Sequence, residues 1–506
     1  MNSFSWVDET PLLDSAQAGG LKRIRTLAEQ LTDDWSGMMG RSSMQTDFGA
    51  IRFQLAFMSY ALGLTHVHRM PAAPGAFRAT FDRLIQKILS PDCWTYWYFE
   101  STGRSSWAAN SVGPFPNEWD PVKRDNIMYS AYVQSMALMY HYLFRDGKYA
   151  EEGALTFTAR DLGSSFYPRS FSYDEKTLNS HLYWLMVERG FLGIACEPNC
   201  IYQVCNQPAI FGFRFHDLVY GGNIAEEVTD GYMKAWSEFG IVNEQDGDGY
   251  NIFVLERERE LANLPTLAGS DFWMGALFHA WNPQFAERQY SKHIKRWSRQ
   301  GPDDTLWIAP SLRGVYEKQI SDPFVTAQDF GWAAVCAAEM GDSGTLTRLL
   351  NYADRYLHPT WEDGAYYYRR NDEWFSGDGL FSAMDPHTGN ALMALARLNV
   401  PGGFTKLYEG PFDDAHFAQP AIEGLDSTID LRRAWFSLEH NALAITFAAA
   451  PTPQRGVLQI VNSRTLPDIT AIGGAASSVE TSWCPENLTL ELNVSYHHET
   501  TLVLSW

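Results

Sequence analysis

Apolar residues recur at helical spacing over most of this chain, from about residue 10 to residue 400. The segments are of two kinds, which alternate along the chain. One kind keeps its charges on one face, as a helix exposed to water does, over residues 21–35, 76–89, 226–239, 286–300 and 344–357. The other kind is apolar nearly all round, which is typical of a buried helix, over residues 52–64, 126–144, 181–195, 272–281 and 331–341.

The alternation of exposed and buried helices predicts two concentric rings, an inner barrel shielded by an outer one. We therefore expect a mainly α fold, an (α/α) toroid. Four buried segments start alike, with an aspartate beside the first apolar residues, at Asp47, Asp271, Asp329 and Asp385. A short polar residue in that place is typical of a helix N-cap, so we interpret the starts as a faint internal repeat that lines one mouth of the barrel.

The pattern changes after residue 400. Residues 434–449, 455–463 and 488–506 show the runs that are typical of β-strands. We predict two domains: a helical domain over residues 1–400 and a small antiparallel β domain over residues 401–506.

The amino-acid composition excludes some classes of function and favours others. Lys and Arg total 39 against 60 Asp and Glu, a formal charge of -21, which repels phosphate backbones and anionic lipid. We expect no nucleic-acid partner and no membrane insertion, and, since there is neither a signal segment nor a membrane-spanning run, a cytoplasmic protein. Aromatic residues make up 14% of the chain, a surplus that hints at an aromatic-lined cavity for a small apolar substrate.

Three of the six cysteines fall within residues 193–208, GIACEPNCIYQVCNQP. A zinc site, a disulfide, buried packing and an active site are all chemically open. Zinc is disfavoured because the trio contains no C-x-x-C pair and the nearest histidine lies in an aromatic run, so we predict no metal. Polar residues crowd the same loop, among them Glu197 and Asn206, which favours a small-molecule site.

Three patches carry a resemblance to a known family. Cys196-Glu-Pro-Asn with Cys205-Asn nine residues later, RDNIMYSAY at 124–132 and TDFG at 46–49 resemble the linalool dehydratase-isomerase family, in matching order. The resemblance extends over residues 20 to 400, roughly the helical part. It implies an (α/α)6 barrel, no cofactor, a homo-oligomer with sites near subunit contacts, and dehydration or isomerisation of a small allylic terpene alcohol.

The resemblance also implies site residues. The two family cysteines match Cys196 and Cys205, the aspartate matches Asp47 and the methionine matches Met128. The family has a histidine where this chain has Tyr132, and a tyrosine where it has Phe53.

These two replacements change the expected chemistry. Dehydration needs an acid for the leaving hydroxyl and a base for a carbon-bound proton. Tyrosine titrates near 10 and phenylalanine not at all, so Asp47 and the two thiols would carry proton transfer. Tyr132 would assist, while Phe53, Met128, Asn206 and Glu197 line the pocket. We expect a cofactor-independent lyase, isomerase or cyclase that acts on a terpenoid-like alcohol or polyene.

Two other functions stay open. Helical toroids also host carbohydrate enzymes, whose paired carboxylates would be Glu362 and Asp363 with Asp271 or Asp329 opposite. A non-catalytic binding toroid is the other alternative, which the replacements at Phe53 and Tyr132 favour and the retained cysteines disfavour.

Overall fold

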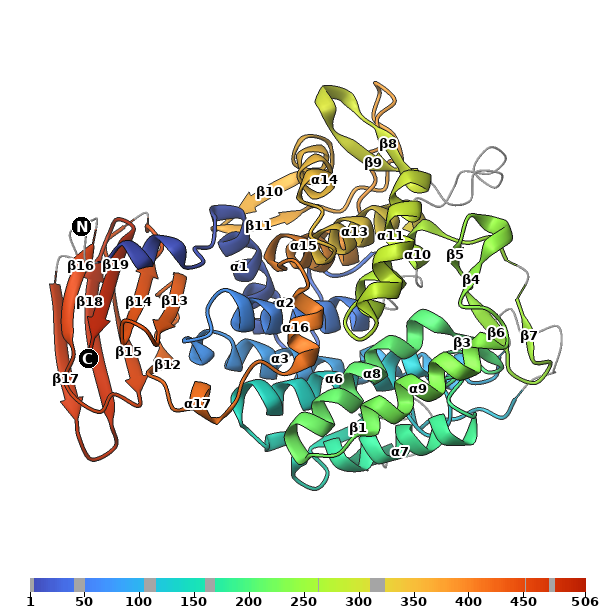
Figure 1. The fold of residues 1–506 in the computed structure, drawn as a ribbon, viewed down its shortest axis with the longest axis horizontal. Helices are drawn as coiled ribbons and strands as arrows, with labels where there is room; N and C mark the ends of the chain where they lie inside the picture. Colours follow the sequence, from blue (N-terminus) through green and yellow to red (C-terminus); the bar gives the residue numbers. More distant parts are fainter. Residues whose placement is uncertain are drawn as a thin grey trace.

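The computed structural model describes residues 4–40, 51–103, 115–159, 169–262, 264–309, 324–450, 452–472 and 478–506. The chain forms a large helical part and a smaller β-rich part beside it, which Figure 1 shows on the left. Both termini lie at the β-rich part. The protein is therefore mainly helical with an antiparallel β region, as the sequence predicts.

Six buried helical segments form the centre of the helical part. They are α2 (Ile51–His68), α6 (Ile127–Phe144), α8 (Gln203–Tyr220), α10 (Ala268–Phe278), α13 (Phe324–Glu339) and the π-helical turn η8 (Thr388–Leu392) that continues into α15 (Met393–Leu398). Each contacts the next in chain order, and α15 contacts α2 again. Among the described residues, the contacts between buried helices thus run round a ring.

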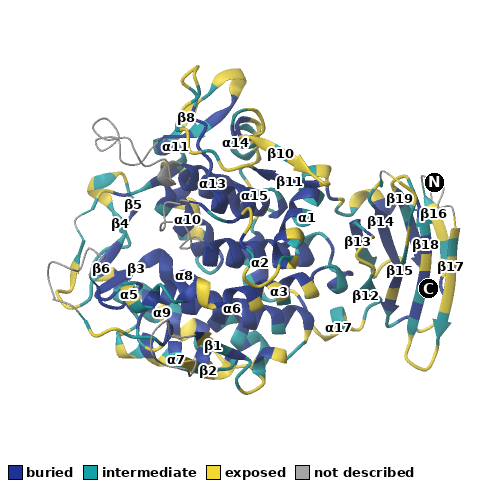
Figure 2. Cartoon of the chain, turned by 180° about the vertical axis from the view of Figure 1, so that it is seen from behind, coloured by how far each residue is buried: buried dark blue, intermediate teal, exposed yellow. Residues whose placement is uncertain are grey.

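A second set of helices lies outside the first. It comprises α1 (Ser15–Glu29), α3 (Arg78–Ile88), α7 (Glu175–Glu188), α9 (Ile224–Ser237), α11 (Pro283–Trp297) and α14 (Ser343–Tyr356). Each packs on one or two of the buried helices and alternates with them along the chain. Figure 2 shows the buried helices in dark blue and the exposed residues at the periphery. The five predicted helices with one charged face overlap α1, α3, α9, α11 and α14, which confirms that these helices exist, although α1 ends at Glu29 and not at residue 35.

The prediction of a buried helix over residues 181–195 is wrong. These residues contain the second half of α7, which is an outer helix: Trp184 is 57% exposed, and the helix ends at Glu188. The buried helix of this region is α8, which begins at Gln203 within the cysteine-containing segment 193–208 and contains Cys205 and Pro208. The apolar pattern did not predict α8, because a proline and a polar loop interrupt the pattern where this helix begins.

The β-rich part is a pair of four-stranded antiparallel sheets. One sheet has the order β12 (Ala421–Leu425), β15 (Gln454–Val461), β18 (Thr489–Tyr496), β17 (Ser478–Cys484); the other has the order β13 (Leu431–Ser437), β14 (Ala442–Phe447), β19 (Thr500–Ser505), β16 (Asp468–Ile472). Alternate residues of both sheets are buried in one apolar cluster, and the rings of Phe447 and Tyr496 meet across the sheets at 4.9 Å. The predicted antiparallel β region is confirmed.

Two short helices, α16 (Gly403–Glu409) and α17 (Asp414–Phe417), precede the first of these strands. The division into domains at residue 400 stays a prediction. The start of the chain reaches the β region, because Trp6 and Val7 pack against Ala442, Ala444 and Val503.

The helical part also contains small sheets that helical periodicity does not predict. They are β1 (Leu155–Ala159) with β2 (Arg169–Tyr173), β3 (Cys200–Tyr202) with β6 (Phe253–Leu255) and β7 (Glu260–Leu261), β4 (Val242–Asn243) with β5 (Gly249–Tyr250), β8 (Ser298–Gln300) with β9 (Leu306–Ile308), and β10 (Pro359–Glu362) with β11 (Ala365–Tyr368). Of these, β3 holds the middle of the cysteine loop.

Candidate functional site

The cysteine loop folds against the start of α6. The backbone N–H of Asn126 donates to the carbonyl of Cys196 at 3.0 Å, and that of Ile127 donates to the carbonyl of Ala195 at 3.3 Å. The side chain of Cys196 makes a further hydrogen bond with the backbone of Met128. The C-E-P-N and D-N-I-M-Y-S motifs, which are far apart in the sequence, therefore form one structure.

Asn206 clamps the other end of the loop. Its Oδ1 accepts from the N–H of Ile194 at 2.7 Å, and its Nδ2 donates to the carbonyls of Ile194 and Tyr202 at 3.1 and 2.8 Å. Gly193 lies so close that a Cβ there would be 2.7 Å from Nδ2 of Asn206, and its φ of +131° also favours glycine. The pocket-lining role predicted for Asn206 stays a prediction; its amide is occupied by the loop backbone.

Cys196 and Cys205 are free, buried thiols that hydrogen-bond to each other. The hydrogen bond from Cys205 lowers the pKa of Cys196, but burial and the carboxylate of Glu197 outweigh it and leave that pKa above the ordinary value. Burial raises the pKa of Cys205 well above its ordinary value, and the hydrogen bond to Cys196 raises it further. Cys196 is thus the more acidic thiol, and Cys205 is the donor that stabilises its thiolate.

Tyr132 stands on α6 near both thiols. Its side chain is fully buried, and its hydroxyl donates to Sδ of Met128, one turn earlier, at 3.6 Å. Burial raises the pKa of Tyr132 well above its ordinary value, and the interactions with Tyr60 and Cys205 add to the rise. Tyr132 is therefore a neutral proton donor whose acceptor, a thioether sulfur, is weak.

Glu197 and Arg52 place charge beside the thiols. Burial raises the pKa of Glu197, which favours the neutral carboxyl, whereas the attraction of Arg52 lowers it. Oε2 of Glu197 has no hydrogen-bond partner among the described residues. The guanidinium of Arg52 lies over the rings of Phe53 and Tyr96, 4.4 and 4.5 Å from their centroids. Arg52 and Tyr96 were not predicted as site residues, because a single cation at the start of an apolar helix does not form a recognisable motif.

Phe53 and Phe57, one turn apart on α2, hold together an aromatic cluster at the centre of the helical part. Both rings contact Tyr132 from α6, Trp273 from α10 and His387 next to η8, with centroid distances of 5.5 to 5.8 Å. Trp332 from α13 stacks on Trp273 at 4.9 Å. We call Phe53, Phe57, Tyr132, Trp273, Trp332 and His387 the aromatic cluster. It joins the predicted residues Phe53 and Tyr132 to four rings that the sequence did not single out as site residues, Phe57, Trp273, Trp332 and His387.

His387 and Asp385 are the polar residues of this region that sequence analysis missed as site residues. His387 is fully buried, and burial lowers its pKa to about 3. Burial also raises the pKa of Asp385 to about 6, although its Oδ1 accepts from the N–H of Thr388 at 2.6 Å. The signal was the segment MDPHTGN, which we interpreted only as a helix start.

The expected N-caps behave differently from one another. Asp47 lies outside the described residues. Asp385 accepts from a backbone N–H three residues on, as an N-cap does. The N-cap prediction is wrong for Asp271 and Asp329, which lie within α10 and α13 and accept from Tyr250 and Gly269 of neighbouring segments.

The carboxylates of the carbohydrate hypothesis come from different elements and have different hydrogen-bond partners. Glu362 and Asp363 are exposed on the hairpin of β10 and β11, where Glu362 accepts from Tyr367 at 2.8 Å. Asp271 is buried and accepts from the indole of Trp297 as well as from Tyr250. These contacts bind the carboxylates to separate structural elements.

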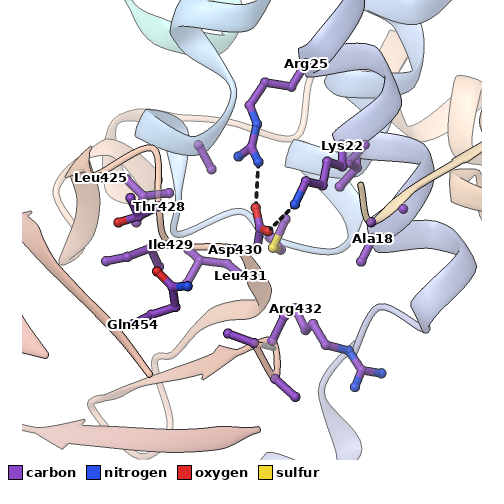
Figure 3. Close-up of a pocket in the computed structure, with 18 of the residues that line it drawn as sticks. Ala18, Lys22, Arg25, Leu425, Thr428, Ile429, Asp430, Leu431, Arg432 and Gln454 are labelled. Atoms are coloured by element: carbon purple, nitrogen blue, oxygen red, sulfur yellow. Dashed lines mark hydrogen bonds and ion pairs between the residues drawn. The ribbon is translucent and has the colours of Figure 1, made fainter. Parts of the chain in front are cut away.

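A cavity of about 670 Å³ lies between α1 and the β region (Figure 3). Asp430 lies between Lys22 and Arg25, at 3.3 and 2.7 Å, and Arg432 pairs with Glu499. These charges satisfy one another, and the cavity is lined by none of the residues of the cysteine loop or the aromatic cluster. We therefore place the candidate active site at the cysteine loop and the aromatic cluster.

Two further properties of the described residues bear on other functions. No group of three or more His, Cys, Asp and Glu side chains in this part of the chain is arranged to hold a metal ion. None of the described helices is long and apolar enough to cross a membrane.

The fold and the site define a mainly helical protein with a buried thiol pair next to an aromatic cluster. Residues 52–374 match the model of the family described as linalool dehydratase/isomerase. This match spans more than half of the chain, so the chain belongs to the linalool dehydratase/isomerase family. The resemblance predicted from the three sequence patches is confirmed.

Solved structures show weaker similarity. The GH76A alpha-1,6-mannanase from Salegentibacter sp. matches with a TM-score of 0.39 and 11% identity, over 78% of this chain and 99% of that one. A D-mannose isomerase matches with a TM-score of 0.40 and 9% identity, over 76% and 97%. Endoglucanase CelQ from Clostridium thermocellum matches with a TM-score of 0.35 and 9% identity, over 97% and 92%. With TM-scores this low, these similarities do not establish the fold or the activity of this chain.

Proposed function

We propose that this protein is a cofactor-independent lyase, isomerase or cyclase that acts on an apolar, terpenoid-like alcohol or polyene. The observation that carries the proposal is the hydrogen-bonded pair of Cys196 and Cys205, held against the start of α6 and electrostatically coupled to Tyr132. Membership of a family named for dehydratase and isomerase activities supports it.

Each polar group has a distinct task in the proposed reaction. Cys196, the more acidic thiol, protonates the leaving hydroxyl, and Cys205 donates to the thiolate that results. The neutral hydroxyl of Tyr132 and the carboxyl of Glu197 hydrogen-bond the substrate oxygen. Asp47 keeps the acid-base role that the family resemblance implies.

The aromatic cluster would stabilise the cation that forms when water leaves. Ring faces attract a cation, by about 0.5 to 2 kcal/mol for each ring and most strongly for tryptophan. Phe53, Trp273 and Trp332 come from three different buried helices, so an apolar chain lying among them would meet ring carbons on several sides. Replacement of the family's tyrosine by Phe53 adds apolar surface, which suits an isomerisation or a cyclisation.

The proposal includes the architecture. The ring of contacts among the buried helices supports an (α/α)6 barrel over residues 1–400, with the accessory β domain over residues 401–506. The homo-oligomer rests on family analogy, and sedimentation velocity tests it directly.

Turnover by matched variants tests the function. Linalool, nerolidol and geranyllinalool are tertiary allylic alcohols of increasing length, and we expect wild type to dehydrate, isomerise or cyclise at least one of them. Cys196→Ser and Cys205→Ser should each lower kcat by about 100-fold or more, in keeping with a general acid. Cys336→Ser, which replaces a buried cysteine of α13 outside the thiol pair, is the control and should retain activity. The proposal is refuted if Cys196→Ser and Cys205→Ser keep their activity and only Cys336→Ser loses it. It is also refuted if neither wild type nor any variant turns over one of these alcohols.

Thiol alkylation provides a second test. Cys484 on β17 is partly exposed, so the experiment uses a Cys484→Ser background to remove its signal. Iodoacetamide should then label Cys196 slowly and inactivate the enzyme, and geranyllinalool should protect both the thiol and the activity. Labelling without inactivation would exclude a role for the thiol in turnover.

A further inference from the structure

His387 is a polar residue of the aromatic cluster whose ring nitrogens bond to none of the described residues. Its ring lies 5.8 Å from those of both Phe53 and Phe57, and it is completely buried. Neither Nδ1 nor Nε2 has a hydrogen-bond partner in the described part of the chain. A neutral imidazole has one N–H and one bare nitrogen, so the described residues leave both a donor and an acceptor without a partner.

Other polar atoms in the same region are also unpartnered among the described residues. They are the indole Nε1 atoms of Trp273 and Trp332. Native proteins leave few buried polar atoms unpaired, and a cluster of them indicates a place where a ligand or water completes the hydrogen bonds. The π-helical turn η8 starts directly after His387, and such turns occur frequently at functional sites.

The position of His387 relative to the thiols indicates a chemical role for its two ring nitrogens. Tyr132, near the thiols, comes from α6, and His387 lies directly before η8. Both α6 and η8 contact α2, on which Phe53 and Phe57 lie. A substrate packed on Phe53 and Phe57 would therefore have the thiols and Tyr132 towards α6 and the imidazole towards η8.

We propose that His387 is a further catalytic residue of the proposed reaction, the base that takes the carbon-bound proton of the substrate. This inference rests on the function proposed above and extends it to a residue beyond the part matched by the family, which ends at residue 374.

The proposed steps balance as follows. The substrate hydroxyl takes a proton from the thiol of Cys196, the C–O bond breaks with both electrons going to oxygen, and water leaves a carbocation. The C–H bond next to the cationic carbon then breaks, its electron pair forms the new C=C bond, and the proton moves to the bare nitrogen of His387. The imidazolium returns this proton to the Cys196 thiolate through the released water, and no redox partner is needed.

The environment of His387 suits this task. Burial lowers its pKa to about 3, so the imidazole is neutral and ready to accept a proton throughout the physiological range. A proton next to a carbocation is very acidic, so even a weakly basic nitrogen removes it.

A pair of cationic probes tests the inference without turnover. Dimethylgeranylammonium carries one N–H that can donate to His387, whereas trimethylgeranylammonium carries the same charge and tail without a donor. We expect wild type to bind the first ion about tenfold more tightly by calorimetry, as for a hydrogen bond with a charged partner. His387→Phe should bind both ions equally, and His387→Asn, which keeps an acceptor, should retain part of the preference.

His66→Phe is the matched control. His66 is a second fully buried histidine among aromatic rings, but it contacts Phe77, Phe144 and Phe412, outside the aromatic cluster. This variant should keep the tenfold preference. Equal binding of the two ions by wild type would overturn the role of His387 and leave the proposed function standing. Failure of both ions to bind wild type would overturn both.

Discussion

Tyr132 donates its hydroxyl to the sulfur of Met128, four residues earlier on the same helix, at 3.6 Å. Because thioether sulfur is a weak acceptor, breaking this hydrogen bond costs little free energy. The hydroxyl is therefore free to turn to a better acceptor. A substrate oxygen near the thiols would be such an acceptor.

We therefore expect Tyr132→Phe to separate stability from activity. The variant should lower kcat by about 10-fold or more, as for a lost proton donor, and reduce the free energy of unfolding by less than about 1 kcal/mol. Tyr129→Phe is the control, because the Tyr129 hydroxyl donates to the carbonyl of Ile88 at 2.8 Å, a contact outside the site. It should cost as much stability or more and leave kcat unchanged. Steady-state kinetics and urea unfolding decide the matter, and equal kcat values for wild type and Tyr132→Phe would contradict the prediction.

Asn206→Ala should loosen the cysteine loop. The substitution removes three hydrogen bonds to the backbone at Ile194 and Tyr202, each worth about 1 kcal/mol. We expect the free energy of unfolding to fall by about 3 kcal/mol and iodoacetamide to label Cys196 faster. Asn199→Ala serves as the comparison, because Asn199 lies in the same loop but bonds Arg257 and Glu258 instead of Ile194 and Tyr202. Unchanged labelling of Cys196 in Asn206→Ala would show that the clamp does not govern access to the thiol.

The raised pKa of Asp385 predicts a pH-dependent stability. Below pH 3.8 the carboxyl is neutral in both the folded and the unfolded state; between pH 3.8 and about 6 only the unfolded chain ionises, so stability falls as pH rises. The loss is complete above about pH 6, where a shift of this size amounts to about 3 kcal/mol. Asp385→Asn should therefore be more stable than wild type at pH 8 and no more stable at pH 4.

Urea unfolding at the two pH values measures this difference. Asp378→Asn is the control, because Asp378 is exposed and its hydrogen bond with Ser376 lowers the pKa of its carboxyl. This control should gain no stability at pH 8. A gain for Asp385→Asn that is the same at pH 4 and pH 8 would refute the electrostatic explanation.

The buried histidines predict sensitivity to acid. Burial lowers the pKa of His66 and of His387 from 6.5 to about 3, so the unfolded chain takes up protons below pH 6.5 that the folded chain does not. Their contribution to stability is fully present above pH 6.5 and is lost as pH falls towards 3. At pH 5, each of these two histidines should lower the free energy of unfolding by about 2 kcal/mol relative to pH 7.

Thermal unfolding of wild type and His66→Phe between pH 7 and pH 5 tests this expectation. The variant should show a shallower decline of Tm because it lacks one of the titrating groups. Parallel declines in both proteins would mean that other groups cause the acid sensitivity.

The arrangement of helices could be predicted from sequence because burial leaves a periodic signal. The helices α1, α3, α9, α11 and α14 each pack one face, so their charges mark the other face. The signal failed at α7, where the apolar run around Trp184 extends onto a face that is exposed, and at α8, where Pro208 interrupts the pattern. Apolarity alone does not distinguish a helix buried all round from one that exposes large side chains.

The site was predictable only where residues form local motifs. Cys196, Cys205, Met128 and Tyr132 belong to two short patches, and the structure brings them together at the start of α6. Trp273, Trp332 and His387 come from helices that meet only in the folded ring, and their local sequence indicates no more than the start of a helix. The pocket roles of Phe53, Glu197 and Asn206, the catalytic role of Asp47 and a cytoplasmic location all stay predictions.

The contact between the two ends of the chain has a consequence for folding during synthesis. Trp6 and Val7 pack on Val503 of β19, so they cannot reach their native position until that strand has left the ribosome. Contacts of such large sequence separation form slowly because a long loop must close first. Nascent chains that have already folded much of the helical part should therefore hold their first residues exposed, and a protease would cut there until synthesis ends.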